Sequence, residues 1–146
     1  MENITLTKGQ EEAIKVAVQR YKDNEKYTVI AGAAGSGKTT TVRYIVDALN
    51  VDMSDVVFAT FTGKASLVLR NKGCHNAMTL HRLLYIPKTL SNGDVEFEER
   101  ATLEYDYKIV VVDEVSMVPQ KMWELLLSHQ IYVIALGDMF QLPPIS

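Results

Sequence analysis

The sequence predicts an α/β fold with a central parallel sheet flanked by helices, and three observations predict it. Short apolar runs alternate along the chain with segments whose apolar residues recur at helical spacing. One run, residues 109–112, is Ile-Val-Val-Val, which is typical of a strand buried on both faces. A glycine-rich segment at 32–39 separates an expected strand from an expected helix. The length of 146 residues predicts one domain over residues 1–146.

Helices are predicted where apolar residues recur three or four positions apart. The first opens at residues 7–10, and others cover residues 40–49, 63–71, 79–84 and 121–128. The expected core residues are Ile14, Ala17, Val18 and Tyr21 in the first helix, Val42, Ile45, Val46 and Leu49 in the second, and Ala65, Leu67, Val68 and Leu69 in the third. Thr79 is the expected N-cap of the fourth helix.

Buried strands are predicted at residues 27–31, 56–60, 109–112 and 131–136. Residues 86–104 interrupt this alternation. Their Ser-Asn-Gly-Asp turn at 91–94 favours a hairpin between residues 88–90 and 95–97. We therefore expect a small β-hairpin insertion in the parallel fold.

The glycine-rich segment matches the phosphate-binding pattern G-x-x-x-x-G-K-[ST] at every fixed position. Glycines let backbone N–H groups surround a phosphate, and the following helix adds the positive end of its dipole. We expect Lys38 to reach the β- and γ-phosphates of a nucleotide and Thr39 to hold Mg²⁺. The expected nucleotide-binding residues here are Gly32, Ala33, Ala34, Gly35, Ser36, Gly37, Lys38, Thr39 and Thr40.

Two carboxylates, Asp113 and Glu114, follow the Ile-Val-Val-Val strand directly. The carboxyl end of a parallel strand faces the ligand crevice. We expect Asp113 to hold Mg²⁺ through water and Glu114 to act as the general base on the attacking water. A pair of solvated acids at a strand end is the plain alternative.

Two glutamines are candidates for reading the nucleotide. Gln141 can donate to a γ-phosphate and accept from the attacking water, although its segment also reads as an ordinary turn before two prolines. Gln10 forms the capping box T-x-x-Q with Thr7. Its amide also matches the donor–acceptor pair of an adenine edge.

A possible nucleic-acid surface follows the second strand. Thr62 and Lys64 lie at the start of a helix, where a hydroxyl, an ammonium group and a helix N-terminus can hold backbone phosphates. Basic residues and histidines, including His81, follow within twenty residues. A solvated basic face explains the same residues equally well.

Taken in order, these segments resemble the first motor domain of a superfamily 1 DNA helicase of the 5′-to-3′ group, which includes RecD-type exonuclease V subunits, Dda-like phage helicases and the helicase parts of conjugative relaxases. Residues 6–10 resemble the Q motif, 32–39 motif I, 59–65 motif Ia, 79–81 motif Ib, 112–118 motif II and 137–144 motif III. The resemblance covers nearly the whole chain.

The resemblance implies a RecA-like P-loop NTPase fold and an ATP-dependent motor that moves on single-stranded DNA and unwinds duplex. It implies ATP and Mg²⁺ as cofactors, Gln10 as the adenine reader and Gln141 as the γ-phosphate sensor. It also makes Thr62, Lys64 and His81 expected single-strand contacts. The hairpin stands where relatives carry the element that splits the duplex. Phe61 departs from the family, which often has proline there.

Relatives continue into a second motor domain with motifs IV to VI, which supplies arginines to the γ-phosphate. The sequence reaches only motif III, so we expect a fragment or excised domain whose partner is that second domain. Two rival readings are a stand-alone nucleotide-binding switch and a small-molecule kinase. The sequence contains no N-K-x-D-like guanine-reading segment. A kinase would not need Asp113-Glu114 or residues 62–64.

The composition is that of an ordinary soluble globular protein, with 47% hydrophobic and 23% charged residues. The net charge of −3 argues against a generally basic surface but not against a local basic groove. One cysteine, no signal-peptide pattern and no apolar run long enough for a membrane helix predict a cytoplasmic protein that does not bind membranes.

The family's usual strand order is 5-1-4-3-2, and this sequence supplies strands 1 to 4. We therefore expect the strand around Val29 to form an open sheet edge and to favour self-association. We also expect Gln141 and the residues after Pro143 to be poorly fixed.

Overall fold

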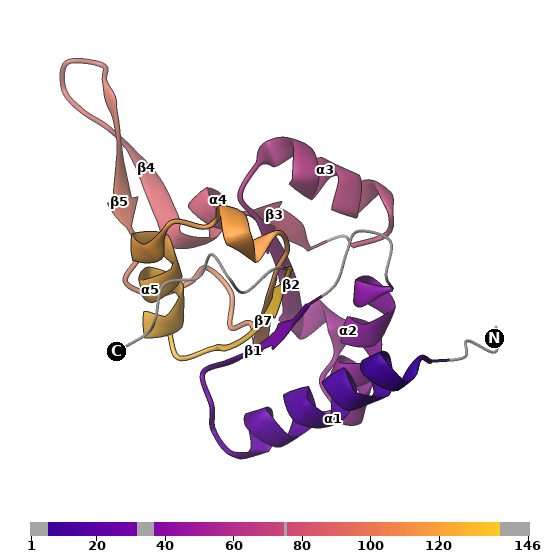
Figure 1. The fold of residues 1–146 in the computed structure, drawn as a ribbon. Helices are drawn as coiled ribbons and strands as arrows, with labels where there is room; N and C mark the ends of the chain where they lie inside the picture. The colour runs from indigo at the N-terminus through magenta and orange to yellow at the C-terminus, as the bar shows by residue number, and fades with distance from the viewer. Residues whose placement is uncertain (1–5, 32–36, 75, 138–146) are drawn as a thin grey trace.

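The computed structural model describes residues 6–31, 37–74 and 76–137. Within these residues a five-stranded sheet forms the centre of the molecule (Figure 1). Its strands lie in the order β1 (Tyr27–Ile30), β7 (Tyr132–Leu136), β6 (Ile109–Val112), β2 (Val56–Thr60) and β3 (Ala77–Thr79), all parallel to their neighbours. The first four strands reproduce the expected order 1-4-3-2, so the predicted α/β fold with a parallel sheet is confirmed.

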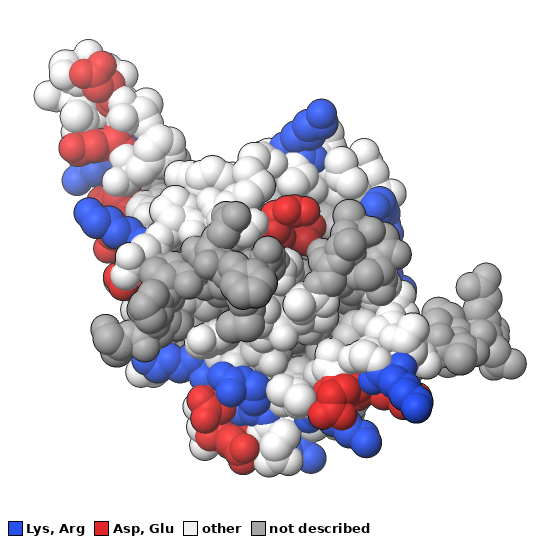
Figure 2. Space-filling view, viewed as in Figure 1, with Lys and Arg blue, Asp and Glu red and all other residues white. Residues whose placement is uncertain are grey.

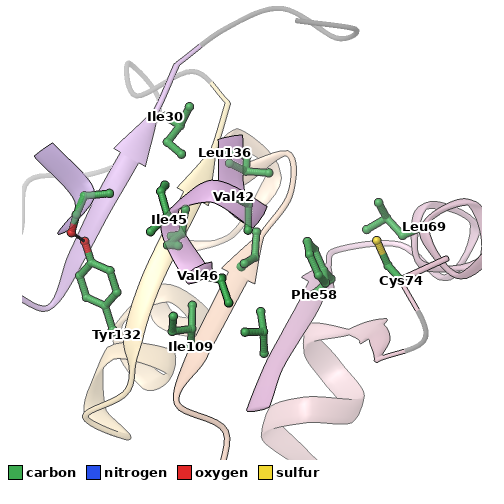
Figure 3. Close-up of a cluster of buried hydrophobic side chains, with 14 of the residues drawn as sticks. Ile30, Val42, Ile45, Val46, Phe58, Leu69, Cys74, Ile109, Tyr132 and Leu136 are labelled. Carbon is green, nitrogen blue, oxygen red and sulfur yellow. Dashed lines mark hydrogen bonds between the residues drawn. The ribbon is translucent and has the colours of Figure 1, made fainter. Parts of the chain in front are cut away.

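Helices cover both faces of the sheet because successive strand residues point to opposite sides. On one face the strands pack against α1 (Lys8–Lys22), α2 (Lys38–Ala48) and α3 (Gly63–Asn71). Val42, Ile45 and Val46 of α2 lie over this face (Figure 3). The other face packs against α4 (Leu80–Leu84) and α5 (Gln120–Ser128). Two short 3₁₀ turns, Met53–Asp55 and Val115–Met117, complete the connections.

Tyr132 on β7 ties α1 to the sheet. Its hydroxyl donates to the carbonyl oxygen of Ala17 at 2.7 Å, and its ring meets Tyr21 edge-on with centroids 5.2 Å apart. Burial raises the pKa of Tyr132 to about 12. The end of α1 is therefore held by both a buried hydrogen bond and an aromatic contact.

The expected hairpin is present and projects from the body of the molecule (Figure 1). Its strands, β4 (Tyr85–Thr89) and β5 (Val95–Glu99), pair antiparallel and are longer than the turn signal alone predicted. Acidic and basic side chains both lie along it (Figure 2). At its base the backbone N–H of Arg100 donates to the carbonyl of Leu84 at 2.8 Å.

Three details differ from the sequence predictions. The strand β3 was not predicted, because three residues are too few for a periodic signal. In α3 the expected core residues Leu67 and Val68 are 51% and 45% exposed, whereas Ser66 and Leu69 are buried. The burial of Ser66 is possible because its hydroxyl donates to the carbonyl of Gly63 at 2.8 Å. In β1 only alternate residues are fully buried, as suits an edge strand.

Candidate functional site

Gln10 joins the start of α1 to the start of α2. Thr7 and Gln10 form the predicted capping box, with Gln10 N donating to Thr7 Oγ1 at 3.1 Å and Thr7 N donating to Gln10 Oε1 at 2.9 Å. The Gln10 Nε2 group donates to Gly37 O and to Thr41 Oγ1, each at 3.3 Å. The capping prediction is confirmed, and the same amide also contacts the end of the phosphate-loop segment.

Gly37 is the N-cap of α2 and has a left-handed backbone, with φ of +80°. A Cβ at this position would lie 2.6 Å from Gln10 Nε2. Glycine therefore satisfies two demands here, the positive φ and the close approach of the Gln10 amide. Lys38 begins α2, and the half-buried Thr39 and Thr40 follow it. The expected contacts Gly32, Ala33, Ala34, Gly35 and Ser36, and the side chain of Lys38, lie outside the described residues.

The two expected carboxylates lie where β6 ends. Asp113 N donates to the carbonyl of Ala59 at 3.0 Å, which continues the sheet ladder by one residue. Asp113 Oδ1 accepts from Glu114 N at 3.0 Å, and Glu114 is exposed with φ of +52°. The turn after β6 thus presents one half-buried and one exposed carboxylate at the carboxyl edge of the sheet.

Gly137 brings the ends of three strands together. It follows β7, its N–H donates to the carbonyl of Ile30 at the end of β1, and the two atoms are 3.0 Å apart. A Cβ on Gly137 would lie 3.4 Å from Val115 N and 3.8 Å from Glu114 Cα. Two segments therefore converge on Gly137. One is β1, which leads into the phosphate loop, and the other is the turn after β6 that carries Asp113 and Glu114. Gln141, the expected sensor, lies outside the described residues.

The expected nucleic-acid residues lie at the turn after β2, in the first turn of α3 and on α4. Thr62 is the N-cap of α3, and its Oγ1 accepts from Ala65 N at 3.2 Å. Lys64 is exposed one helical position after Gly63. The exposed His81 ring contacts Phe61 and Tyr85, with centroid separations of 6.0 and 5.7 Å. Phe61 and Tyr85 also pack against the core, so both rings are held in place.

Thr41 and Tyr85 were not predicted as site residues. Thr41 stands four positions after Gly37, which was predicted, and this helical spacing was an available signal. A threonine at that spacing can donate to the carbonyl one turn earlier, as Thr41 does to Gly37 O at 3.0 Å.

Residues 6–31, 37–74 and 76–137 contain no group of three or more His, Cys, Asp or Glu residues placed to bind a metal ion. A magnesium site built from one carboxylate, one hydroxyl and a nucleotide would not appear as such a group. None of the described helices has the length and hydropathy to span a membrane.

Known proteins are similar to this chain in sequence and in fold. A family model described as AAA domain matches residues 10–146. The chain is 30% identical to the ATP-dependent DNA helicase dda of Enterobacteria phage T4, covering 97% of this chain and 33% of that protein. It is 32% identical to the ATP-dependent RecD2 DNA helicase of Deinococcus radiodurans, over 83% of this chain and 16% of that protein. A crystal structure of a Pif1 helicase from Bacteroides superposes with a TM-score of 0.61 and 26% identity, covering the whole chain and 35% of that structure. The chain thus spans about a third or less of these relatives.

Proposed function

The chain belongs to the AAA domain family, and we propose that it is the ATP-binding first motor domain of an ATP-dependent DNA helicase. Relatives named as DNA helicases match most of its length, which supports the predicted resemblance to superfamily 1 over a stand-alone switch. The observation that carries the proposal is the convergence at Gly137. The phosphate-loop strand and the carboxylate turn meet there, as nucleotide hydrolysis requires.

The described residues fit a magnesium nucleotide. Gly37 supplies a left-handed backbone at a helix N-terminus, and Asp113 supplies a carboxylate of the kind that Mg²⁺ prefers. We propose that Lys38 binds the β- and γ-phosphates and that Thr39 and Asp113 hold Mg²⁺, Asp113 through water. Glu114 would take the proton of the attacking water, Gln141 would sense the γ-phosphate, and Gln10 would read adenine. ATP bound with Mg²⁺ supplies the γ-phosphoryl group for hydrolysis.

We propose that single-stranded DNA crosses the turn after β2. Thr62 and Lys64 at the start of α3 would contact backbone phosphates. His81, flanked by Phe61 and Tyr85, offers an aromatic surface on which bases can stack. This surface continues into β4, so the bound strand would lead toward the hairpin, where duplex would be separated.

Two partners are proposed. The second motor domain of a longer parent would supply arginines to the γ-phosphate, since the relatives are about three or more times as long as this chain. A second copy of this chain would pair with the edge strand β1. That edge is partly covered, because Arg20 Nε donates to the carbonyl of Tyr27 at 2.7 Å and the guanidinium lies 5.5 Å above the Tyr27 ring.

We propose a cytoplasmic location for the motor.

Calorimetry with ATP and Mg²⁺ tests the nucleotide site. We expect saturable binding by the chain and loss of most of it in Lys38→Ala. The exposed Lys15 on α1 provides the matched control, and Lys15→Ala should bind as the unchanged chain does. Equal affinity of Lys38→Ala and Lys15→Ala would contradict the assignment.

Steady-state ATP hydrolysis tests the need for a second domain. An arginine supplied to the γ-phosphate is worth about 10³ to 10⁵ in rate. The chain alone should therefore be nearly inactive, and single-stranded DNA should not rescue it. Robust DNA-stimulated turnover by this chain would show that it contains the whole catalytic apparatus.

A further inference from the structure

The amide of Gln10 is held in one orientation by Thr7, Thr41 and the carbonyl of Gly37. Its oxygen accepts from Thr7 N at 2.9 Å, and its nitrogen donates to Thr41 Oγ1 at 3.3 Å. Thr41 donates its own hydroxyl hydrogen to Gly37 O at 3.0 Å, so toward Gln10 it acts as an acceptor. A flipped amide would turn its nitrogen toward the Thr7 N–H and its oxygen toward two acceptors. The polarity of the Gln10 amide is therefore fixed.

Three donors surround the carbonyl oxygen of Gly37, one more than its two lone pairs can accept from. Thr41 N and Thr41 Oγ1 both lie 3.0 Å from this oxygen, and Gln10 Nε2 lies 3.3 Å away. The Gln10 contact is the longest of the three, so it is the contact that a ligand can replace at least cost. After that exchange, Thr41 would still hold the amide.

We propose that Thr41 is a positioning residue that gives the site its preference for adenine over guanine. The inference rests on the proposed ATP site, in which Gln10 reads the base. Adenine presents a donor at N6 and an acceptor at N7, which pair with the oxygen and nitrogen of a glutamine amide. The second lone pair of Gln10 Oε1 would accept from N6, and the hydrogen released from Gly37 O would go to N7. Guanine presents O6 in place of N6, so the fixed amide oxygen would face another acceptor.

Thr41 is suited to this role by its burial. Its residue is 1% exposed, and its hydroxyl lies between the Gly37 carbonyl and the Gln10 amide. A role confined to supporting the phosphate loop would make every phosphate-bearing ligand bind less well. A role in orienting Gln10 would change only the choice between bases. The two roles therefore give different results with ligands that carry and lack a base.

The test measures the dissociation constants of ATP, GTP and tripolyphosphate, each with Mg²⁺, by calorimetry. Thr41→Val keeps the side-chain shape and removes the hydroxyl, whereas Thr41→Ser keeps the hydroxyl. We expect the GTP-to-ATP ratio of dissociation constants to fall about tenfold in Thr41→Val and to be retained in Thr41→Ser. Tripolyphosphate affinity should change by less than about twofold in both variants. If Thr41→Val does not fold, Thr41→Ala removes the same hydroxyl.

Three results would overturn the inference. One is an unchanged GTP-to-ATP ratio in Thr41→Val. Another is an equal loss of affinity for all three ligands, which would assign Thr41 to loop support. The third is an unchanged ratio in Gln10→Ala. That result would show that Gln10 does not read the base, and the proposed ATP site would stand. Absence of both ATP and tripolyphosphate binding by the unchanged chain would instead overturn the proposed function.

Discussion

The sheet body and the β4–β5 hairpin use similar residues in opposite ways. Every residue of β2, β6 and β7 is buried between two layers of helices. Every residue of β5 is exposed, although its sequence Val-Glu-Phe-Glu-Glu alternates as a half-buried strand does. Its apolar face pairs Phe97 with Pro87 and Val95 with Thr89, and Val95 and Phe97 stay 57% and 62% exposed.

This difference separates two sources of order. The body depends on apolar contacts between segments distant in sequence, so a substitution in one segment affects the packing of the others. The hairpin depends on its own strand pairing, its Asn-Gly turn and the Arg100–Leu84 bond at its base. We therefore expect body substitutions to alter folding and nucleotide binding together, and hairpin substitutions outside its turn to alter neither.

The largest contrast is expected from apolar truncation in the two regions. Ile134 in β7 is 0% exposed, so Ile134→Ala should lower the free energy of unfolding by about 2 to 5 kcal/mol. Phe97→Ala in the hairpin should change it by less than about 0.5 kcal/mol. Urea unfolding followed by circular dichroism measures both. Surface substitutions usually change the free energy of unfolding by less than about 0.5 kcal/mol. A loss above about 1 kcal/mol for Phe97→Ala would therefore mean that the hairpin packs against the body in solution.

Two glycines with positive φ, one in each region, allow a second test. Gly37→Ala and Gly93→Ala should each cost about 1 to 2 kcal/mol from the left-handed backbone. Gly37→Ala should cost more and weaken ATP binding, because its Cβ would lie 2.6 Å from Gln10 Nε2. Nothing lies within 4 Å of a Cβ at Gly93, in the hairpin turn. Unfolding and ATP titrations of the two variants compare them, and equal ATP affinities would show that the Gln10 contact does not matter for binding.

The positions of the four core strands and of the hairpin could be predicted from the residues themselves, whereas the order of the strands in the sheet was predicted from the family resemblance. The buried strands are continuous apolar runs, and the Asn-Gly turn is a local signal. The capping role of Gln10 could also be predicted, because Thr7 and Gln10 are three residues apart. The contact of Gln10 with Thr41 could not, because it joins residues 31 positions apart. Helical periodicity also failed in α3, since two apolar stripes were available and only packing decides between them.

A smaller effect is expected at Tyr132, which anchors α1 to the body. Tyr132→Phe should cost about 1 kcal/mol near neutral pH through loss of the hydrogen bond to Ala17. The pKa of Tyr132 is about 12 in the folded protein, above the ordinary value of about 10 in an unfolded chain. The neutral hydroxyl therefore stabilises the fold below pH ~10, and this stabilisation is lost as the pH rises toward ~12. Unfolding from pH 8 to 12 should show a steeper loss for the unchanged chain than for Tyr132→Phe. Tyr44→Phe, at a more exposed position, is the control and should follow the unchanged chain.

The smallest effect is expected from removing the hairpin's outer part. Ile86 and Glu98 stand opposite each other, so residues 87–97 can be replaced by Asn-Gly while two pairs and the Arg100–Leu84 bond remain. The free energy of unfolding should change by less than about 1 kcal/mol, because all the removed residues except the half-buried Leu90 are exposed and the loop shortens. ATP affinity should also stay the same.

In a full-length parent the same replacement should impair unwinding more than translocation, because separation of the strands would need the projecting arm and movement along one strand would not. Leu84→Ala, at a fully buried position beside the hairpin base, is the contrasting variant and should destabilise the body. Equal loss of unwinding and translocation after the replacement would assign the hairpin a structural role in the motor.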